Sequence, residues 1–203
     1  LIVFFPIKQI FVIDDGSVDE SSIIATNLGV NVVTLPQNRG KGAALQIGFN
    51  KIISAGLLFA FSIDSDLQHL PEKLPEFIEK QNKYRAGIII GKREFSLKRM
   101  PWERIFSNKT TSWMTSFVCG QLIQDSQSGF RLYYLPIQNE MNFKSDRYQF
   151  ETEILIEYSK KGLLCGSISI PTIYNDEVSY INHFRDIKNF VHLIWGELIV
   201  KYM

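Results

Sequence analysis

Strand-like and helix-like segments alternate through the first ninety residues, and this alternation restricts the fold more than any other feature. Four segments are rich in apolar and β-branched side chains: residues 8–13, 30–35, 57–63 and 86–90. Helical patterns separate them over residues 19–27, 45–53 and 72–81. Strands that are apolar throughout and alternate with helices form a mostly parallel sheet covered on both faces. The sequence therefore predicts an α/β fold.

The second half of the chain is less regular. Helical patterns cover residues 104–118, 148–161 and 186–203, and strand-like segments cover 132–135 and 163–170. Residues 172–182 are expected to form a loop. With no repeat and no linker, 1–203 is interpreted as one domain, in which 1–90 and 91–185 form two halves and 186–203 a C-terminal helix.

Composition excludes several classes of protein. Lys plus Arg is 22 and Asp plus Glu is 21, so the net charge of +1 gives no support to a nucleic-acid binder. The two cysteines, Cys119 and Cys165, form no C-x-x-C pair, which disfavours a disulfide framework or a zinc site and fits a reducing compartment. No apolar run reaches the roughly 18 residues of a membrane-spanning helix.

The C-terminal helix has one apolar face. Its apolar side chains recur at helical spacing: Ile187, Phe190, Val191, Ile194, Trp195 and Leu198. Two interpretations remain open at this point, a helix packed on the core and an amphipathic helix lying in a membrane interface.

Two acidic clusters follow predicted strands, where ligands bind in sheets of this kind. Asp64 and Asp66 come after residues 57–63, with Gln68 two positions on, and these oxygens suit one Mg²⁺ or Mn²⁺ ion. A solvated acidic loop is the alternative. Asp14 and Asp15 come after residues 8–13 and either bind a ribose or base or cap an Asx-type turn.

A glycine-flanked basic loop, residues 38–44, leads into the predicted helix over 45–53. Gly40 and Gly42 flank Lys41, and glycine lets a backbone approach a ligand while a helix N-terminus favours anions. The spacing is not that of a P-loop, and no G-x-G-x-x-G follows a strand, which argues against a Rossmann dehydrogenase.

Six ordered segments together resemble family 2 glycosyltransferases of the GT-A fold, in the dolichol-phosphate mannose or glucose synthase-like branch. They are IDDGSVDES, NRGKGAALQIGF, SIDSDLQHLPE, GKR, DSQSGFRLY and RYQFETEILI, the last followed by PTIY. The resemblance implies a Rossmann-like GT-A sheet flanked by helices. It also implies inverting transfer of a sugar from a UDP- or GDP-sugar to a dolichyl or undecaprenyl phosphate, in cell-envelope glycan synthesis at the cytoplasmic face of a membrane.

The same resemblance implies roles for individual residues. Asp14, Asp15 and Lys41 correspond to donor-binding positions, and Asp64, Asp66 and Gln68 to the metal and diphosphate site. Arg93, Arg104, Ser128 and Arg131 correspond to positions near the acceptor phosphate, and Asp66, Arg93, Asp125 and Arg131 are the expected catalytic set. Gly129 belongs to the same D-x-x-S-G-F-R segment. For Glu151, Glu153, His69 and Arg185, a functional role and a structural role or solvated position both remain open.

Charge accounts for the expected mechanism. A divalent cation and Lys41 stabilise the leaving nucleoside diphosphate. The acceptor phosphate monoester is largely dianionic at neutral pH, with a second pKa near ~6, so it needs positive charge around it rather than a general base. Arginine is suited to hold it. The alternatives are transfer to a carbohydrate hydroxyl and an inactive domain that binds a nucleotide-sugar.

One departure from the family pattern concerns the start of the chain. Family members carry a strand and helix before the D-D-G-S strand, and only 13 residues precede Asp14 here. We therefore expect that strand, which completes the donor pocket, to be missing from this sequence.

Overall fold

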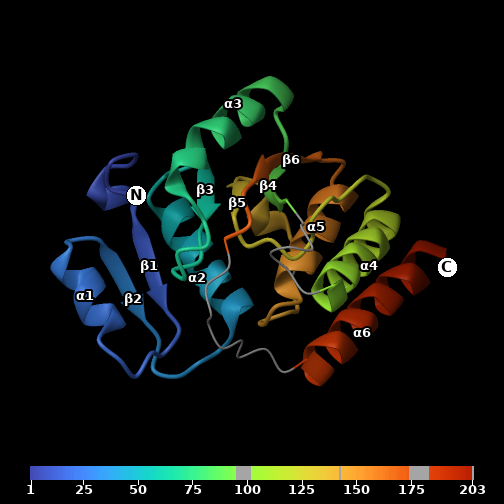
Figure 1. The fold of residues 1–203 in the computed structure, drawn as a ribbon, viewed down its shortest axis with the longest axis horizontal. Coiled ribbons are helices and arrows are strands. Elements are labelled where there is room, and N and C mark those ends of the chain that lie inside the picture. The colour runs from blue at the N-terminus through green and yellow to red at the C-terminus, as the bar shows by residue number, and fades with distance from the viewer. Residues whose placement is uncertain (95–101, 142, 174–182, 203) are drawn as a thin grey trace. The chain divides into compact units, whose positions relative to one another are not determined.

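The computed structural model describes residues 1–94, 102–141, 143–173 and 183–202 (Figure 1). The chain divides into two compact units. The first contains Leu1–Ala60 and Leu135–Phe150, and the second contains Phe61–Tyr134 and Glu151–Met203. The expected division of function between a nucleotide-sugar-binding half, 1–90, and an acceptor-side half, 91–185, stays a prediction. The predicted loop at 172–182 lies outside the described residues from position 174 onward.

In the first unit, two parallel strands are joined by a helix. β1 (Phe11–Asp14) pairs with β2 (Asn31–Thr34), and α1 (Ser21–Asn27) forms the crossover between them. Parallel strands need such a crossover because the chain must return to the same end of the sheet. β1 begins later than predicted, since residues Ile7–Gln9 after Pro6 form a 3₁₀ helix (η1).

The long helix of the first unit packs on this strand pair. α2 (Lys41–Ser54) buries Phe49 and places Gly48 against β1, where an added Cβ would lie 3.3 Å from the Ile13 side chain. The rings of Phe49 and Phe150 lie 6.4 Å apart, which anchors the 135–150 segment with its short 3₁₀ helix η3 (Gln138–Glu140). The predicted helix over 45–53 is therefore confirmed and starts four residues earlier.

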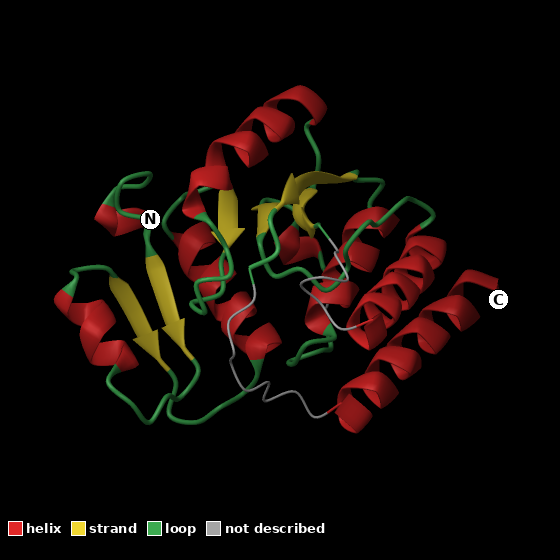
Figure 2. Ribbon diagram, in the orientation of Figure 1, coloured by secondary structure: helices red, strands yellow, loops and turns green. Residues whose placement is uncertain are grey.

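The second unit contains most of a four-stranded sheet, whose strands are yellow in Figure 2. The strand order is β3-β5-β4-β6 (Figure 1). The strands are β3 (Phe59–Ser62), β4 (Ile88–Arg93), β5 (Arg131–Tyr134) and β6 (Cys165–Ile170). β4 is parallel to β6 and antiparallel to β5. The antiparallel strand β5, which the sequence pattern did not distinguish, lies between β3 and β4.

The helices of the second unit follow the predicted order. They are η2 (Pro71–Lys73), α3 (Leu74–Tyr84), α4 (Trp102–Cys119), α5 (Phe150–Lys160) and α6 (His183–Tyr202). Phe77 of α3 packs on Phe130 at a ring distance of 4.6 Å, and Phe61 meets Phe77 edge-on at 5.5 Å. This aromatic cluster fills the core beside the loop that carries Asp64.

The C-terminal helix α6 packs on its neighbours. Ile194 is buried with Val118 of α4 and Ile156 of α5. Lys160 of α5 holds Glu197 of α6 in an ion pair of 2.7 Å. One face of α6 therefore packs on the core, as the first interpretation predicts. No helix in the described ranges has both the length and the apolar character needed to cross a membrane.

Candidate active site

Asp14 and Asp15, both in the first unit, use their carboxylates differently. Asp14 is buried; its Oδ1 accepts the backbone N–H of Ser17 at 2.9 Å, which is an Asx-type turn. Its Oδ2 is buried as well, and none of the described residues donates a hydrogen bond to it. Asp15 accepts the backbone N–H groups of Arg39 and Gly40 at 2.8 and 2.7 Å. Asp14 is therefore the better placed of the two to accept a donor from a ligand.

The glycines of the 38–44 loop are explained by the chain itself rather than by a ligand. Gly40 has φ +101°, and a Cβ there would lie 2.8 Å from the carbonyl oxygen of Asp146. A Cβ on Gly42 would lie 2.6 Å from Cβ of Phe150. The N–H of Ala43 donates to the Asp146 carbonyl at 2.8 Å. The start of α2 thus contacts the 146–150 segment of the same unit, and Lys41 lies half-buried at its first position.

In the second unit, the loop after β3 carries Asp64, Asp66 and Gln68. Asp66 Oδ1 accepts the N–H of Gln68 at 3.0 Å, and the N–H of Asp64 donates to Nδ1 of His69 at 3.1 Å. The His69 ring stacks on Phe130 at 5.1 Å. Since Nδ1 accepts a hydrogen bond, the neutral ring carries its proton on Nε2. His69 therefore anchors this loop to the aromatic core.

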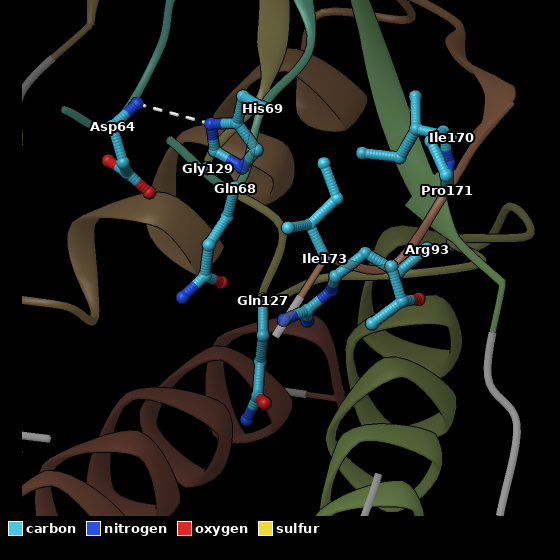
Figure 3. A pocket seen from close by; sticks show the side chains of 10 residues that line it. Asp64, Gln68, His69, Arg93, Gln127, Gly129, Ile170, Pro171 and Ile173 are labelled. Atoms are coloured by element: carbon cyan, nitrogen blue, oxygen red, sulfur yellow. Dashed lines mark hydrogen bonds between the residues drawn. The ribbon is translucent and has the colours of Figure 1, made fainter. Parts of the chain in front are cut away.

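A pocket in the second unit brings several predicted residues together (Figure 3). It is lined by Asp64, Gln68, His69, Arg93, Gln127, Gly129 and residues 170–173. In Figure 3 the guanidinium of Arg93 points toward the side of the pocket where Gln68 and Gln127 lie. A carboxylate and amide oxygens can bind a cation, and a guanidinium can bind phosphate oxygens.

The oxygen ligands of this loop fit a hard divalent cation that takes its remaining ligands from water and from a substrate. Asp64 and Gln68 offer a carboxylate and an amide oxygen, and Asp66 lies between them in the same loop. Within the described part of the chain, no group of three or more His, Cys, Asp or Glu side chains forms a complete ligand set. Mg²⁺ typically binds through one or two carboxylates, with water and substrate phosphates as further ligands.

Arg93 is held by a buried carboxylate. Asp125 is fully buried and accepts Nε and Nη2 of Arg93, both at 2.9 Å, and the Arg93 backbone N–H at 3.1 Å. Burial alone would raise the pKa of Asp125, but the hydrogen bonds and charge of Arg93, with a hydrogen bond from Asn108, hold this pKa below its usual value. Asp125 therefore stays ionised as the partner of Arg93.

Arg131 has a different environment. Its side chain is completely buried, and Nε, Nη1 and Nη2 donate to the backbone carbonyls of Ser128, Glu151 and Ser126 at 2.7, 2.6 and 2.8 Å. These bonds join the 126–128 loop to the start of α5. The hydroxyl of Ser128 is buried, and no described residue hydrogen-bonds to it. Arg131 therefore has a structural role, because its hydrogen bonds hold the 126–128 loop in place.

The remaining candidates are placed as follows. Glu151 and Glu153 are both 5% exposed, so the solvated-face interpretation of these two is wrong, because they lie on the buried side of α5. Arg104 and Arg185 lie on α4 and α6, and their side chains are outside the described part of the structure.

Sequence reasoning missed two polar residues at this site. Gln127 lines the pocket, and Asn108 donates to Asp125 Oδ1 at 3.1 Å. Asn108, Ser112, Thr115 and Ser116 recur at helical spacing on α4, and a polar stripe of this kind within a predicted helix was the available signal. It was not recognised because polar stripes usually face solvent.

Comparison with known proteins identifies the family of the chain. The family described as glycosyl transferase family 2 matches residues 4–133. The chain belongs to this family. An uncharacterised protein of Methanocaldococcus jannaschii is 32% identical over 174 residues, covering 83% of this chain and 72% of the relative. The UDP-N-acetylglucosamine–dolichyl-phosphate N-acetylglucosaminyltransferase of Methanococcus voltae is 29% identical, with 83% and 76% covered.

A more distant relative and the solved structures complete the comparison. The polyprenol monophosphomannose synthase of Mycolicibacterium smegmatis is 27% identical, and the match covers 73% of this chain and 60% of the length of that relative. Glucosyl-3-phosphoglycerate synthase from Mycobacterium tuberculosis, in complex with Mn²⁺ and UDP-glucose, has a TM-score of 0.67 at 16% identity, with 94% of this chain and 66% of that chain covered. The predicted α/β fold of GT-A type is thus confirmed, and the protein is a glycosyltransferase.

Proposed function

We propose that this protein transfers a sugar, with inversion at the anomeric carbon, from a UDP- or GDP-sugar to a polyprenyl phosphate in a metal-dependent reaction. The observation that carries the proposal is the pocket in which Asp64 and Gln68 lie with Arg93. The names of the relatives from Methanococcus voltae and Mycolicibacterium smegmatis support the acceptor class, since both act on a polyprenyl or dolichyl phosphate.

The cation site is the first element of the proposal. Asp64, Asp66 and Gln68 would hold Mg²⁺ or Mn²⁺, and the presence of Mn²⁺ with UDP-glucose in a structural relative supports this choice. When bound, the cation supplies positive charge to the donor diphosphate and stabilises it as a leaving group. His69 holds the backbone of Asp64 in place, because its Nδ1 accepts a hydrogen bond from the Asp64 N–H.

On the donor side, Asp14 is the proposed nucleoside ligand. Its buried Oδ2 would accept a hydrogen bond from a ribose hydroxyl or a base N–H, which would satisfy an acceptor that is costly to leave unpaired. Asp15 supports the 38–40 loop through its two backbone hydrogen bonds. Lys41 adds positive charge for the diphosphate.

The acceptor phosphate is the proposed nucleophile. One of its anionic oxygens forms a bond to the anomeric carbon while the bond from that carbon to the diphosphate oxygen breaks, and the electron pair leaves with the nucleoside diphosphate. No proton has to move, because the phosphate is already ionised at neutral pH. Arg93 holds this phosphate, and Asp125 keeps the guanidinium in place rather than acting as a base, because its oxygens already accept four donors.

A lipid acceptor also calls for contact with a membrane surface, and we place this contact on α4 and α6 at the cytoplasmic face. On α4, Trp102, Phe106, Trp113 and Phe117 are between 51% and 69% exposed and lie on one side of the helix, with exposed Lys109 among them. On α6, Ile187, Val191, Trp195 and Ile199 are between 44% and 66% exposed. Exposed apolar helix faces rich in aromatic residues, with lysines, are typical of helices that lie on anionic membranes.

The decisive experiment measures release of nucleoside diphosphate from a panel of UDP- and GDP-sugars, with and without a short polyprenyl phosphate. We expect release to depend on the polyprenyl phosphate and to fall at least about a hundredfold in Arg93→Ala, since phosphate contacts by arginine are charge-assisted. Lys83→Ala, an exposed cation on α3, is the matched control and should retain full activity. Turnover with only a soluble glycan, or donor binding without any turnover, would contradict the proposal.

A further inference from the structure

The inner face of α4 carries a buried polar residue that contacts the partner of Arg93. Asn108 is 2% exposed, and its Nδ2 donates to Asp125 Oδ1 at 3.1 Å. With the three hydrogen bonds from Arg93, this bond completes a set of four donors around a carboxylate that is fully buried. A buried carboxylate keeps one orientation when each of its oxygens is engaged on more than one side.

The orientation of the Asn108 amide is itself determined. Its Oδ1 accepts the hydroxyl of Ser112, one helical turn later, at 3.3 Å. Because an amide presents a carbonyl on one side and an NH₂ on the other, this contact turns Nδ2 toward Asp125. Ser112 Oγ in turn accepts the N–H of Ser126 at 3.0 Å, in the loop that follows Asp125.

We propose that Asn108 is a positioning residue for acceptor binding, because it acts through Asp125 to orient the Arg93 guanidinium in the pocket. The inference rests on the proposed function, in which Arg93 holds the acceptor phosphate. The two carboxylate oxygens of Asp125 accept hydrogen bonds from Nε and Nη2 of Arg93. Any rotation of the carboxylate therefore moves the guanidinium as well. Asn108 is the side chain that opposes this rotation among the described side chains of α4, because it hydrogen-bonds the carboxylate.

A second polar residue of α4 provides a matched control. Ser116 Oγ accepts the N–H of Ile123 at 2.9 Å, and its hydroxyl can donate to the backbone carbonyl of Ser112 at 2.7 Å or to that of Ile123 at 3.2 Å. Ser116 therefore joins α4 to the same loop, two residues before Asp125, without a hydrogen bond to the Asp125–Arg93 pair among those described. Loss of Ser116 weakens the attachment of the loop, whereas loss of Asn108 releases the carboxylate.

The test compares Asn108→Ala with Ser116→Ala in the full chain. We expect Asn108→Ala to raise the KM for a short polyprenyl phosphate about tenfold, because a hydrogen bond to a buried charge is lost. The KM for the donor should stay within about twofold. In Ser116→Ala both constants should stay close to those of the original protein. Asn108→Ser, whose hydroxyl is too short to reach the carboxylate, serves as a second variant if the alanine variant fails to fold.

A spectroscopic measurement separates this inference from the proposed function. The Nε–H of Arg93 is identified in a ¹⁵N NMR spectrum by its loss in Arg93→Lys, and its hydrogen exchange is then followed. Asn108→Ala should accelerate this exchange at least about fivefold, and Ser116→Ala should not. Unchanged exchange in Asn108→Ala, or equal acceleration in both variants, would overturn the positioning role.

Activity outcomes are read independently of the exchange measurement. If exchange accelerates in Asn108→Ala and the acceptor KM is unchanged in an active enzyme, the positioning role is wrong. If the original protein shows no turnover with polyprenyl phosphate, the proposed function has failed. The dissociation constant of farnesyl phosphate then takes the place of KM: weakening in Asn108→Ala alone supports the inference, and equal binding in both variants overturns it.

Discussion

Residues of the same type have different roles in this protein because their hydrogen-bond partners differ. Asp14 and Asp15 are adjacent, yet only Asp15 has both carboxylate oxygens on backbone N–H groups of the 38–40 loop. Arg93 and Arg131 differ in a similar way. Arg131 is buried among carbonyls, whereas the Arg93 side chain is 24% exposed and lines the pocket. Partner and burial, rather than residue type, decide which of them is available to a ligand.

Asp14 gives a prediction at this scale. Asp14→Asn keeps an oxygen for the Ser17 N–H but replaces the buried Oδ2 with an NH₂ group, which cannot accept a hydrogen bond. We expect the dissociation constant of UDP or GDP to rise about tenfold, in keeping with the loss of one charge-assisted hydrogen bond. Isothermal titration calorimetry measures it directly.

The control for this prediction is Asp19→Asn. Asp19 also accepts a backbone N–H, that of Ser21 at 3.0 Å, but it is exposed to solvent. Its replacement should leave nucleotide binding unchanged. An unaltered dissociation constant for both UDP and GDP in Asp14→Asn would show that Asp14 serves only the turn.

Among the elements, α4 has two distinct faces. Its inner face carries Asn108, Ser112 and Thr115, all buried, and connects to the loop that holds Asp125. Its outer face carries four large aromatic side chains exposed to solvent. Helices with a buried polar face and an exposed aromatic face are unusual in a globular protein, since exposed apolar groups of this size mark contact surfaces. The outer face is the basis of the membrane proposal.

Membrane contact through α4 and α6 predicts binding to anionic vesicles. The full chain should co-sediment with phosphatidylcholine vesicles that contain phosphatidylglycerol, and high salt should reduce this binding because lysines such as Lys109 contribute. Trp113→Glu on α4 and Trp195→Glu on α6 should each lower the bound fraction several-fold, because a carboxylate replaces an exposed aromatic ring that would insert into the membrane surface.

Ile24→Glu on α1, where Ile24 is 58% exposed, is the matched control for these variants and should sediment like the original chain. If the chain does not sediment with any vesicle, the helix faces have another function. If only Trp195→Glu reduces binding, α4 is not part of the contact.

At the scale of the whole molecule, the proposed reaction requires a divalent cation at the loop that carries Asp64, Asp66 and Gln68. Chelation by EDTA should abolish polyprenyl-phosphate-dependent turnover, and added Mn²⁺ or Mg²⁺ should restore it, since the leaving diphosphate needs positive charge. Asp66→Ala should abolish turnover. Asp64→Asn should raise the Mn²⁺ concentration for half-maximal rate at least about tenfold, because a charged ligand is lost.

Glu72→Gln, a change at an exposed acid beyond the same loop, is the control and should keep the metal dependence of the original chain. The concentration series with each metal gives the constants. Full turnover in EDTA, or a normal Mn²⁺ requirement in Asp64→Asn, would contradict the assignment of the cation to this loop.

The order of elements and the family follow from patterns that can be recognised along the chain. Apolar segments of five to seven residues between helical patterns are local features, so β1–β4 and their intervening helices were predicted with errors of only a few residues. Acidic pairs at strand ends and the six ordered motifs identified the glycosyltransferase family for the same reason, since each motif is contiguous in the chain.

The tertiary structure alone decided how the polar residues are used. Asp125 reaches Arg93 across 32 residues, and Arg131 reaches the Glu151 carbonyl across 20. The position of β5 between β3 and β4 is equally non-local. A carboxylate or a guanidinium has a limited number of hydrogen-bonding positions, and burial makes each unpaired one costly. Whether such a group is available to a ligand therefore depends on partners that are distant in sequence and become neighbours only in the fold.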